Sequence, residues 1–143
     1  MSTSPASCRI LYVEDNPAEA HLLDSTLKSS LVPFELTVLE NGEQALMFIE
    51  AKPFLPDVIV LDLNMPGIDG LTVLATLKAD PTLKSIPVLV FVSPNTPNWK
   101  RARELKAELC LAKPFDLKGY DYVAESIRQL SQGVSGKTMA AAS

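Results

Sequence analysis

Short apolar runs alternate with longer helix-forming segments along this chain of 143 residues, and no other feature constrains its fold as strongly. The runs at 57–62 and 87–92 each contain at least four consecutive apolar residues, which is typical of strands covered on both faces. Strands are predicted at 8–14, 34–40, 57–62, 87–92 and 109–112. Helices are predicted at 15–30, from Asn41, at 70–79, from Pro97 to about Glu108, and at 118–130. This alternation predicts a parallel sheet with right-handed crossovers and helices on both faces.

The length and charge of the chain indicate one globular domain, which we place at residues 7–131, with disordered tails at 1–6 and 132–143. Apolar residues make up 47% of the chain, which is enough for a substantial core. A formal charge of −4 argues against a nucleic-acid partner. No apolar run reaches the ~20 residues of a membrane span, and the N-terminus lacks a signal-peptide pattern. We therefore expect a cytoplasmic protein.

Charged residues collect at the carboxyl ends of the predicted strands. Glu14 and Asp15 end the first strand, Asp62 ends the third, and Lys113 directly follows the fifth. Carboxyl ends of parallel strands share one edge of a sheet, where ligands bind in folds of this kind. A helix cap or a solvated turn would explain Glu14 or Asp15 alone, but not the whole group.

The composition of this edge indicates phosphoryl chemistry supported by a metal. Crowded carboxylates repel one another and favour a divalent cation, and an all-oxygen ligand set suits Mg²⁺ or Mn²⁺. The sequence has no nucleophilic cysteine motif, serine–histidine pair or phosphate-binding glycine loop. A carboxylate is the remaining nucleophile, and it could become an acyl phosphate with Lys113 beside the transferred charge.

Four segments in order, "ILYVEDN", "VLDLNMPGIDG", "IPVLVFV" and "LAKPF", make the chain resemble a response-regulator receiver domain of two-component signalling. The resemblance covers about residues 7–131. It implies a flavodoxin-like doubly wound sheet of five strands in the order 2-1-3-4-5. In that order two strands separate Cys8 from Cys110, so we expect no disulfide between them.

The same resemblance implies the roles of the edge residues. Asp62 would be the phosphoacceptor, and Lys113 would bind the phosphoryl group. Glu14, Asp15, Asp62 and the backbone carbonyl of Asn64 would hold the metal. The Lys113–Pro114 peptide bond would be cis, as in the family. Within the turn after Asp62, Pro66 and Gly67 fit a tight bend, and Gly70 would let the next helix begin close by.

Two positions depart from the family pattern. Val92 stands where the family has a Thr or Ser hydroxyl, and Cys110 stands where it has an aromatic switch residue. Ser93 is the next residue and could supply the hydroxyl from a shifted position, or it could be a turn residue before Pro94. The chemistry of the edge is therefore expected to be intact, and the relay that reports phosphorylation is expected to be altered.

We interpret the chain as a stand-alone receiver that is phosphorylated by a histidine kinase or phosphotransfer protein and signals to a downstream protein. Two alternatives remain open: a degenerate receiver that binds partners without phosphorylation, and a small phosphatase with an aspartyl nucleophile. Asn64 opposes the phosphatase, which usually needs a carboxylate at that place. The last feature is a predicted partner or homodimer contact on the face of the fourth helix, fifth strand and fifth helix, formed by Trp99, Lys100, Arg101 and Arg103.

Overall fold

The predicted order of strands and helices is present in the computed structural model, which describes residues 7–30, 33–93 and 97–133. The strands are β1 (Cys8–Val13), β2 (Phe34–Leu39), β3 (Val58–Asp62), β4 (Val88–Val92) and β5 (Leu109–Ala112). The helices are α1 (Pro17–Ser29), α2 (Gly42–Ala51), α3 (Gly70–Ala79), α4 (Asn98–Glu104) and α5 (Leu117–Ser131). The predicted tails at 1–6 and 132–143 lie outside the described residues, except that Gln132 and Gly133 follow α5.

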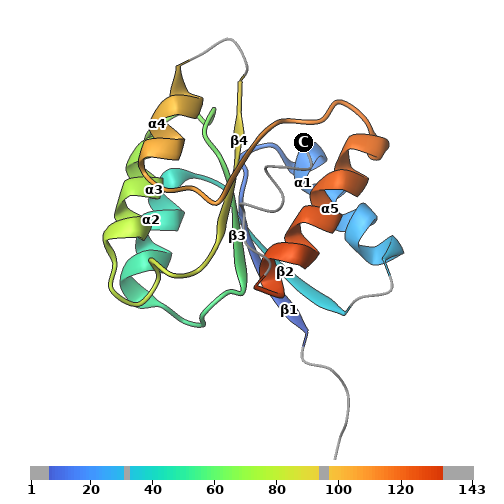
Figure 1. The fold of residues 1–143 in the computed structure, drawn as a ribbon, viewed down its shortest axis with the longest axis horizontal. Coiled ribbons are helices and arrows are strands. Elements are labelled where there is room, and N and C mark those ends of the chain that lie inside the picture. The colour runs from blue at the N-terminus through green and yellow to red at the C-terminus, as the bar shows by residue number, and fades with distance from the viewer. Residues whose placement is uncertain (1–6, 31–32, 94–96, 134–143) are drawn as a thin grey trace, which may run out of the picture.

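The strands form one parallel sheet in the order β2-β1-β3-β4-β5, which confirms the predicted doubly wound fold. Helices α2, α3 and α4 cover one face of the sheet, and α1 and α5 cover the other (Figure 1). All five residues of β3 and of β4 are buried, because these central strands pack against helices on both sides.

Each face of the sheet has its own apolar layer. Leu61, Val73 and Leu77 belong to the layer beneath α2, α3 and α4, and Tyr12 and Ile127 belong to the layer beneath α1 and α5. These layers fix the sheet between its helices. The carboxyl ends of β1 and β3, where Glu14 and Asp62 lie, are therefore held by a rigid core.

The turn after β3 brings α3 close to the strand end. Gly67 has a positive φ of 87°, a conformation that glycine adopts readily. At Gly70 a Cβ atom would lie 2.7 Å from the Cα of Leu63, which is closer than two such atoms can approach. Gly70 therefore permits the close start of α3 that the sequence predicted.

Two expectations about the second half of the chain were wrong. Helix α4 ends at Glu104, not near Glu108, because Glu108 is bound directly before β5. Its carboxylate binds Lys78 at 2.8 Å and accepts the Val88 N–H at 2.7 Å. Its own N–H donates to the Val88 carbonyl, as in an extension of the sheet.

The Lys113–Pro114 bond is trans, contrary to the implied cis form, since no peptide bond in the described ranges is cis. The trans isomer of an X–Pro bond is favoured by about 0.5–1 kcal/mol. Lys113 already reaches the edge carboxylates from the trans form, so the contacts do not require the less stable isomer.

Candidate functional site

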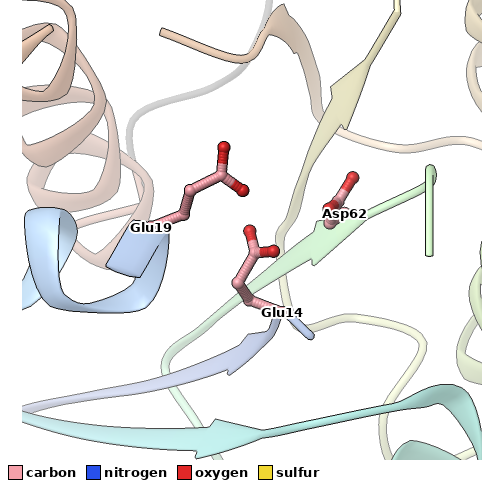
Figure 2. A group of neighbouring side chains, drawn as sticks. All are labelled: Glu14, Glu19 and Asp62. Carbon is pink, nitrogen blue, oxygen red and sulfur yellow. The ribbon is translucent and has the colours of Figure 1, made fainter. Parts of the chain in front are cut away.

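Three carboxylates converge at the carboxyl edge of the sheet. Glu14 directly follows β1, Asp62 is the last residue of β3, and Glu19 lies in the first turn of α1. Each offers an oxygen that lies within 4.8 Å of the oxygens of the other two. Figure 2 shows the three side chains pointing toward one common space. The arrangement concentrates negative charge at one place.

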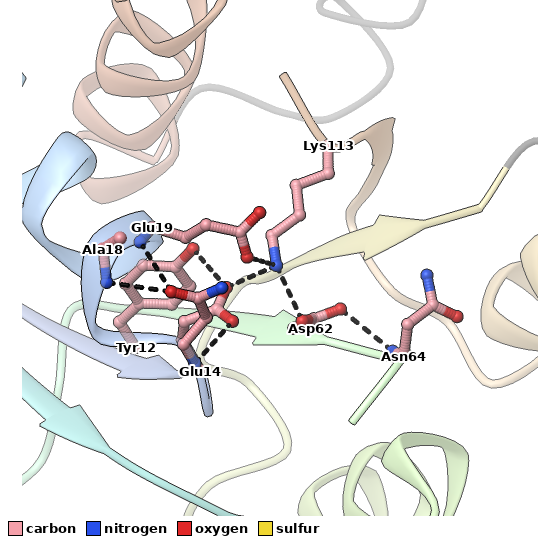
Figure 3. A network of polar contacts seen from close by, with 8 residues as sticks. Tyr12, Glu14, Ala18, Glu19, Asp62, Asn64 and Lys113 are labelled. Atoms are coloured by element: carbon pink, nitrogen blue, oxygen red, sulfur yellow. Dashed lines mark hydrogen bonds and ion pairs between the residues drawn. The ribbon is translucent and has the colours of Figure 1, made fainter. Parts of the chain in front are cut away.

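Lys113 places its ammonium group among these carboxylates (Figure 3). The Nζ atom lies 2.7 Å from Glu14 Oε1 and 2.8 Å from Asp62 Oδ2, and it also binds Glu19. An ammonium group has three N–H donors. Three carboxylates therefore occupy the full donor capacity of Lys113.

The two innermost carboxylates are held by further hydrogen bonds. Glu14 Oε1 accepts the Tyr12 hydroxyl at 2.9 Å, and Glu14 Oε2 accepts the Asn16 N–H at 3.2 Å. Asp62 Oδ1 accepts the Asn64 N–H at 2.9 Å. The side chains of Glu14 and Asp62 are only 0% and 3% exposed. Both carboxylates are therefore fixed in position before any ligand arrives.

Burial and charge shift the protonation of this cluster. Burial raises the pKa of Glu14 to about 7, because loss of water disfavours its ionised form more than Lys113 favours it. Burial alone would lower the pKa of Lys113, but hydrogen bonds to Asp62, Glu14 and Glu19 outweigh it and leave that pKa above its ordinary value. Lys113 therefore stays charged, whereas Glu14 exchanges a proton near neutral pH.

Tyr120 lies fully buried beside this network, on α5. Its hydroxyl makes no hydrogen bond of normal geometry with any part of the chain that the structure describes. Burial, reinforced by the nearby charge of Glu19, raises the pKa of Tyr120. The phenol therefore stays neutral at physiological pH and adds no charge to the site.

The predicted residues separate into a buried group and an exposed group. Glu14, Asp62 and Lys113 are brought together as expected. Asp15 is exposed and lies outside the carboxylates that approach one another within 4.8 Å. Asn64 is also exposed, but its backbone is tied to Asp62.

The residues at the end of β4 are placed as the sequence indicated. Val92 is the last residue of the strand, pairs with Ala112 of β5 and belongs to the apolar layer beneath α4. Ser93 follows it and is half-buried. A hydroxyl is therefore absent from the strand's final position, and Ser93 stands one residue beyond it.

Glu19 is the member of the cluster that the sequence analysis missed. It stands three residues after the helix cap Asn16, a spacing at which glutamate often folds back to accept the N–H of the cap residue. Here Glu14 accepts the Asn16 N–H instead. The Glu19 carboxylate is thereby left to reach Lys113. The spacing from Asn16 indicates only that Glu19 lies at the start of a helix. The partner of its carboxylate depends on Lys113, which is distant in the sequence.

The donor set fits a hard divalent cation. Glu14, Glu19 and Asp62 offer only carboxylate oxygens, which are the ligands that Mg²⁺ and Mn²⁺ prefer. No cysteine or histidine belongs to this group. Glu14 and Asp62, the two buried members, can therefore hold such an ion where Lys113 now balances their charge.

The predicted contact residues form a partly apolar, basic surface on α4. Trp99 is 36% exposed, and the Lys100 ammonium lies 5.7 Å from the centre of its ring. Arg101 and Arg103 are exposed, and Arg101 pairs with Glu104 at 3.8 Å. Within the described ranges, no helix is both long and apolar enough to cross a membrane.

Comparisons with known proteins agree on one family. A family model described as the response regulator receiver domain matches residues 10–120. Response regulator Rcp1 of a Synechocystis species is 38% identical over 115 residues, which are 76% of this chain and 78% of that protein.

Solved structures extend the agreement to the fold. The phosphorylated cyanobacterial phytochrome response regulator RcpA superposes with a TM-score of 0.81 and 33% identity, over 91% of this chain and 97% of that chain. The Mn²⁺-bound form of Rcp1 gives a TM-score of 0.75 and 35% identity, over 85% and 91% of the two chains.

Proposed function

The chain belongs to the response regulator receiver domain family, and on that premise we propose that Asp62 accepts a phosphoryl group from a histidine kinase or phosphotransfer protein. Receiver domains are signalling modules that act with such donors. The observation that carries the assignment is the buried Asp62 carboxylate, which ends β3 between a backbone donor and an ammonium group.

The proposed reaction is a displacement at phosphorus. A carboxylate oxygen of Asp62 forms the new P–O bond while the P–N bond to the donor histidine breaks, and the departing imidazole keeps the electron pair and takes up a proton. Lys113 then donates to a phosphoryl oxygen and balances part of its charge. Hydrolysis of the acyl phosphate by water would return Asp62 to its starting state.

We propose that Mg²⁺ or Mn²⁺ is held by Glu14 and Asp62, with Asp15 and the backbone carbonyl of Asn64 contributing as the family resemblance implies. When bound, the ion neutralises charge that develops on the phosphoryl oxygens. The oxygen-only donor set supports this assignment, as does the Mn²⁺-bound structure of the relative Rcp1. The roles of Tyr12 and Asn16 would be to keep the Glu14 carboxylate oriented.

The decisive experiment is incubation with a small-molecule phosphodonor and Mg²⁺, followed by intact mass measurement. The wild-type protein should gain the mass of one phosphoryl group, and Asp62→Asn should gain none. Asp15→Asn should lose the Mg²⁺-dependent labelling. An equal gain in Asp62→Asn would refute Asp62 as the acceptor.

We further propose that the output of this protein runs through the α4–β5–α5 face, by contact with a downstream protein or a second copy. Exposed Trp99 beside basic residues supports a contact there. Val92 and Cys110 occupy the places of the usual switch residues, so the family's hydroxyl and aromatic relay is replaced. A phosphorylation-independent binding role is favoured if labelling of Asp62 leaves this face unchanged.

A further inference from the structure

The geometry points to Glu19 as an internal competitor of the phosphoryl group for Lys113. In the structure Glu19 is the third anion on the Lys113 ammonium, beside Glu14 and Asp62. We propose that phosphorylation requires Lys113 to release Glu19, and that Glu19 thereby limits how readily the site accepts and keeps its phosphoryl group. This inference rests on the proposed function of Asp62.

The carboxylates around Lys113 use up its capacity to donate hydrogen bonds. Its three N–H groups face three carboxylates, so no donor is left for an incoming phosphoryl oxygen. A phosphoryl oxygen can gain a charge-assisted hydrogen bond from Lys113 only if one carboxylate gives up its own. The ammonium keeps its proton throughout, and only its hydrogen-bond partner changes.

Of the three carboxylates, Glu19 is the one held most weakly. Glu14 is tied to Tyr12 and Asn16, and Asp62 is tied to Asn64, whereas the Glu19 carboxylate makes no hydrogen bond other than that to Lys113 within the described part of the chain. The Glu19 side chain is also 31% exposed, against 0% for Glu14 and 3% for Asp62. Water can therefore replace Lys113 as the hydrogen-bond partner of Glu19 with a smaller loss of free energy than for Glu14 or Asp62.

The charge of Glu19 also opposes a phosphoryl group on Asp62. A phosphoryl group on Asp62 adds negative charge to a place where Glu14 and Glu19 already lie within 4.8 Å of Asp62. Like charges at such distances repel one another. Removing the charge of Glu19 should therefore favour the phosphorylated state both by freeing Lys113 and by reducing repulsion.

Glu19→Gln tests the proposal, because it removes the charge and keeps the size of the side chain. The matched control is Glu43→Gln, which removes an exposed acid from the first turn of α2, another helix with an asparagine cap. Beryllofluoride, a non-covalent phosphoryl mimic, is titrated at saturating Mg²⁺ and followed by amide spectra. Mg²⁺ affinity is measured separately by calorimetry, and labelling by a small-molecule phosphodonor is followed by intact mass.

Glu19→Gln should bind beryllofluoride about two- to fivefold more tightly than the wild type, as expected for loss of a competing, partly exposed ion pair. Its phosphorylated form should also persist longer. Glu43→Gln should match the wild type, and Mg²⁺ affinity should be unchanged in both variants. A merely structural role of Glu19 would not tighten the binding of an anion.

Equal or weaker beryllofluoride binding by Glu19→Gln would overturn the competition and leave Asp62 as the phosphoacceptor. Loss of Mg²⁺ affinity in this variant would overturn it as well, because Glu19 would then act as a metal ligand. Absence of the Asp62 mass gain in both the wild type and Glu19→Gln would overturn the proposed function together with this inference.

Discussion

Glu14 makes the stability of the metal-free protein depend on pH in an unusual direction. Its pKa is about 7 in the folded protein, against an ordinary value of 4.5. Between these values the folded state holds a proton that the unfolded chain has lost. The contribution of Glu14 to the free energy of unfolding therefore falls as the pH rises through this window.

Glu14→Gln should remove this dependence. Relative to the wild type, the variant should gain on the order of 2–3 kcal/mol of unfolding free energy between pH 4.5 and pH 7.5, since each pKa unit corresponds to about 1.4 kcal/mol. Denaturant unfolding in the presence of a chelator, at several pH values, measures the difference. Parallel pH profiles for the two proteins would show that burial does not raise the pKa of Glu14.

The hydroxyl group of Ser93 is expected to affect how the site binds a phosphoryl group. Val92 offers no hydroxyl at the end of β4, and an unmatched phosphoryl oxygen would lose a charge-assisted bond of about 1.5–3 kcal/mol. We expect Ser93 to supply this bond. Ser93→Ala should then weaken beryllofluoride binding about tenfold and reduce the amide shifts across α4, whereas Val92→Thr should strengthen binding. Identical spectra for the wild type and Ser93→Ala would make Ser93 a turn residue only.

Among the elements, the junction of β3 with α3 depends on close packing at one glycine. A methyl group at Gly70 would meet the Leu63 backbone, which cannot move aside without displacing the strand end that carries Asp62. Gly70→Ala should lower the free energy of unfolding by about 1–3 kcal/mol, in the range of other overpacked sites. Thermal or denaturant unfolding measures the loss.

Gly67→Ala is the matched control for this junction. Gly67 has open space around its Cα, and its cost comes only from the left-handed backbone, about 1–2 kcal/mol. The two variants should differ in the site, because only Gly70→Ala moves the end of β3. Labelling of Asp62 should slow in Gly70→Ala and stay near the wild-type rate in Gly67→Ala. Equal labelling rates in the two variants would show that the packing at Gly70 does not affect phosphorylation of Asp62.

On the scale of the whole molecule, sheet order keeps the two cysteines apart. Both are free, and β3 and β4 lie between the strands that carry Cys8 and Cys110. Three strand spacings amount to about 14 Å, well beyond the ~7 Å between Cα atoms that a disulfide allows. After mild oxidation, peptide mapping without reduction should find no intramolecular Cys8–Cys110 bond. Such a bond in the folded monomer would contradict the sheet order.

A second prediction at this scale concerns assembly through the α4–β5–α5 face. If phosphorylation acts through a second copy, beryllofluoride with Mg²⁺ should raise the molar mass measured by light scattering. Trp99→Ala should weaken this response severalfold, because large buried aromatics dominate contacts of this kind. Met47→Ala is the control, since Met47 is 69% exposed on α2, outside this face. An equal loss in both variants would exclude Trp99 as a specific contact.

Local sequence patterns were sufficient to identify the fold class and the family. Apolar periodicity located the strands, and Asn41 marked the start of a helix that it caps in the structure. These signals are local, so they can be interpreted without knowing which distant residues are in contact. The rule that parallel strands share one carboxyl edge was enough to bring Glu14, Asp62 and Lys113 together.

The contacts that join distant segments could not be read from local patterns and became visible in the folded chain. Glu19 reaches Lys113 across 94 positions of sequence, and it is available because Glu14 takes the Asn16 N–H. Helix α4 ends early because Lys78 and Val88 bind Glu108, and neither lies near it in the sequence. In both cases local spacing allowed two outcomes. The observed outcome depends on side chains that come into contact only when the sheet and its helices have packed.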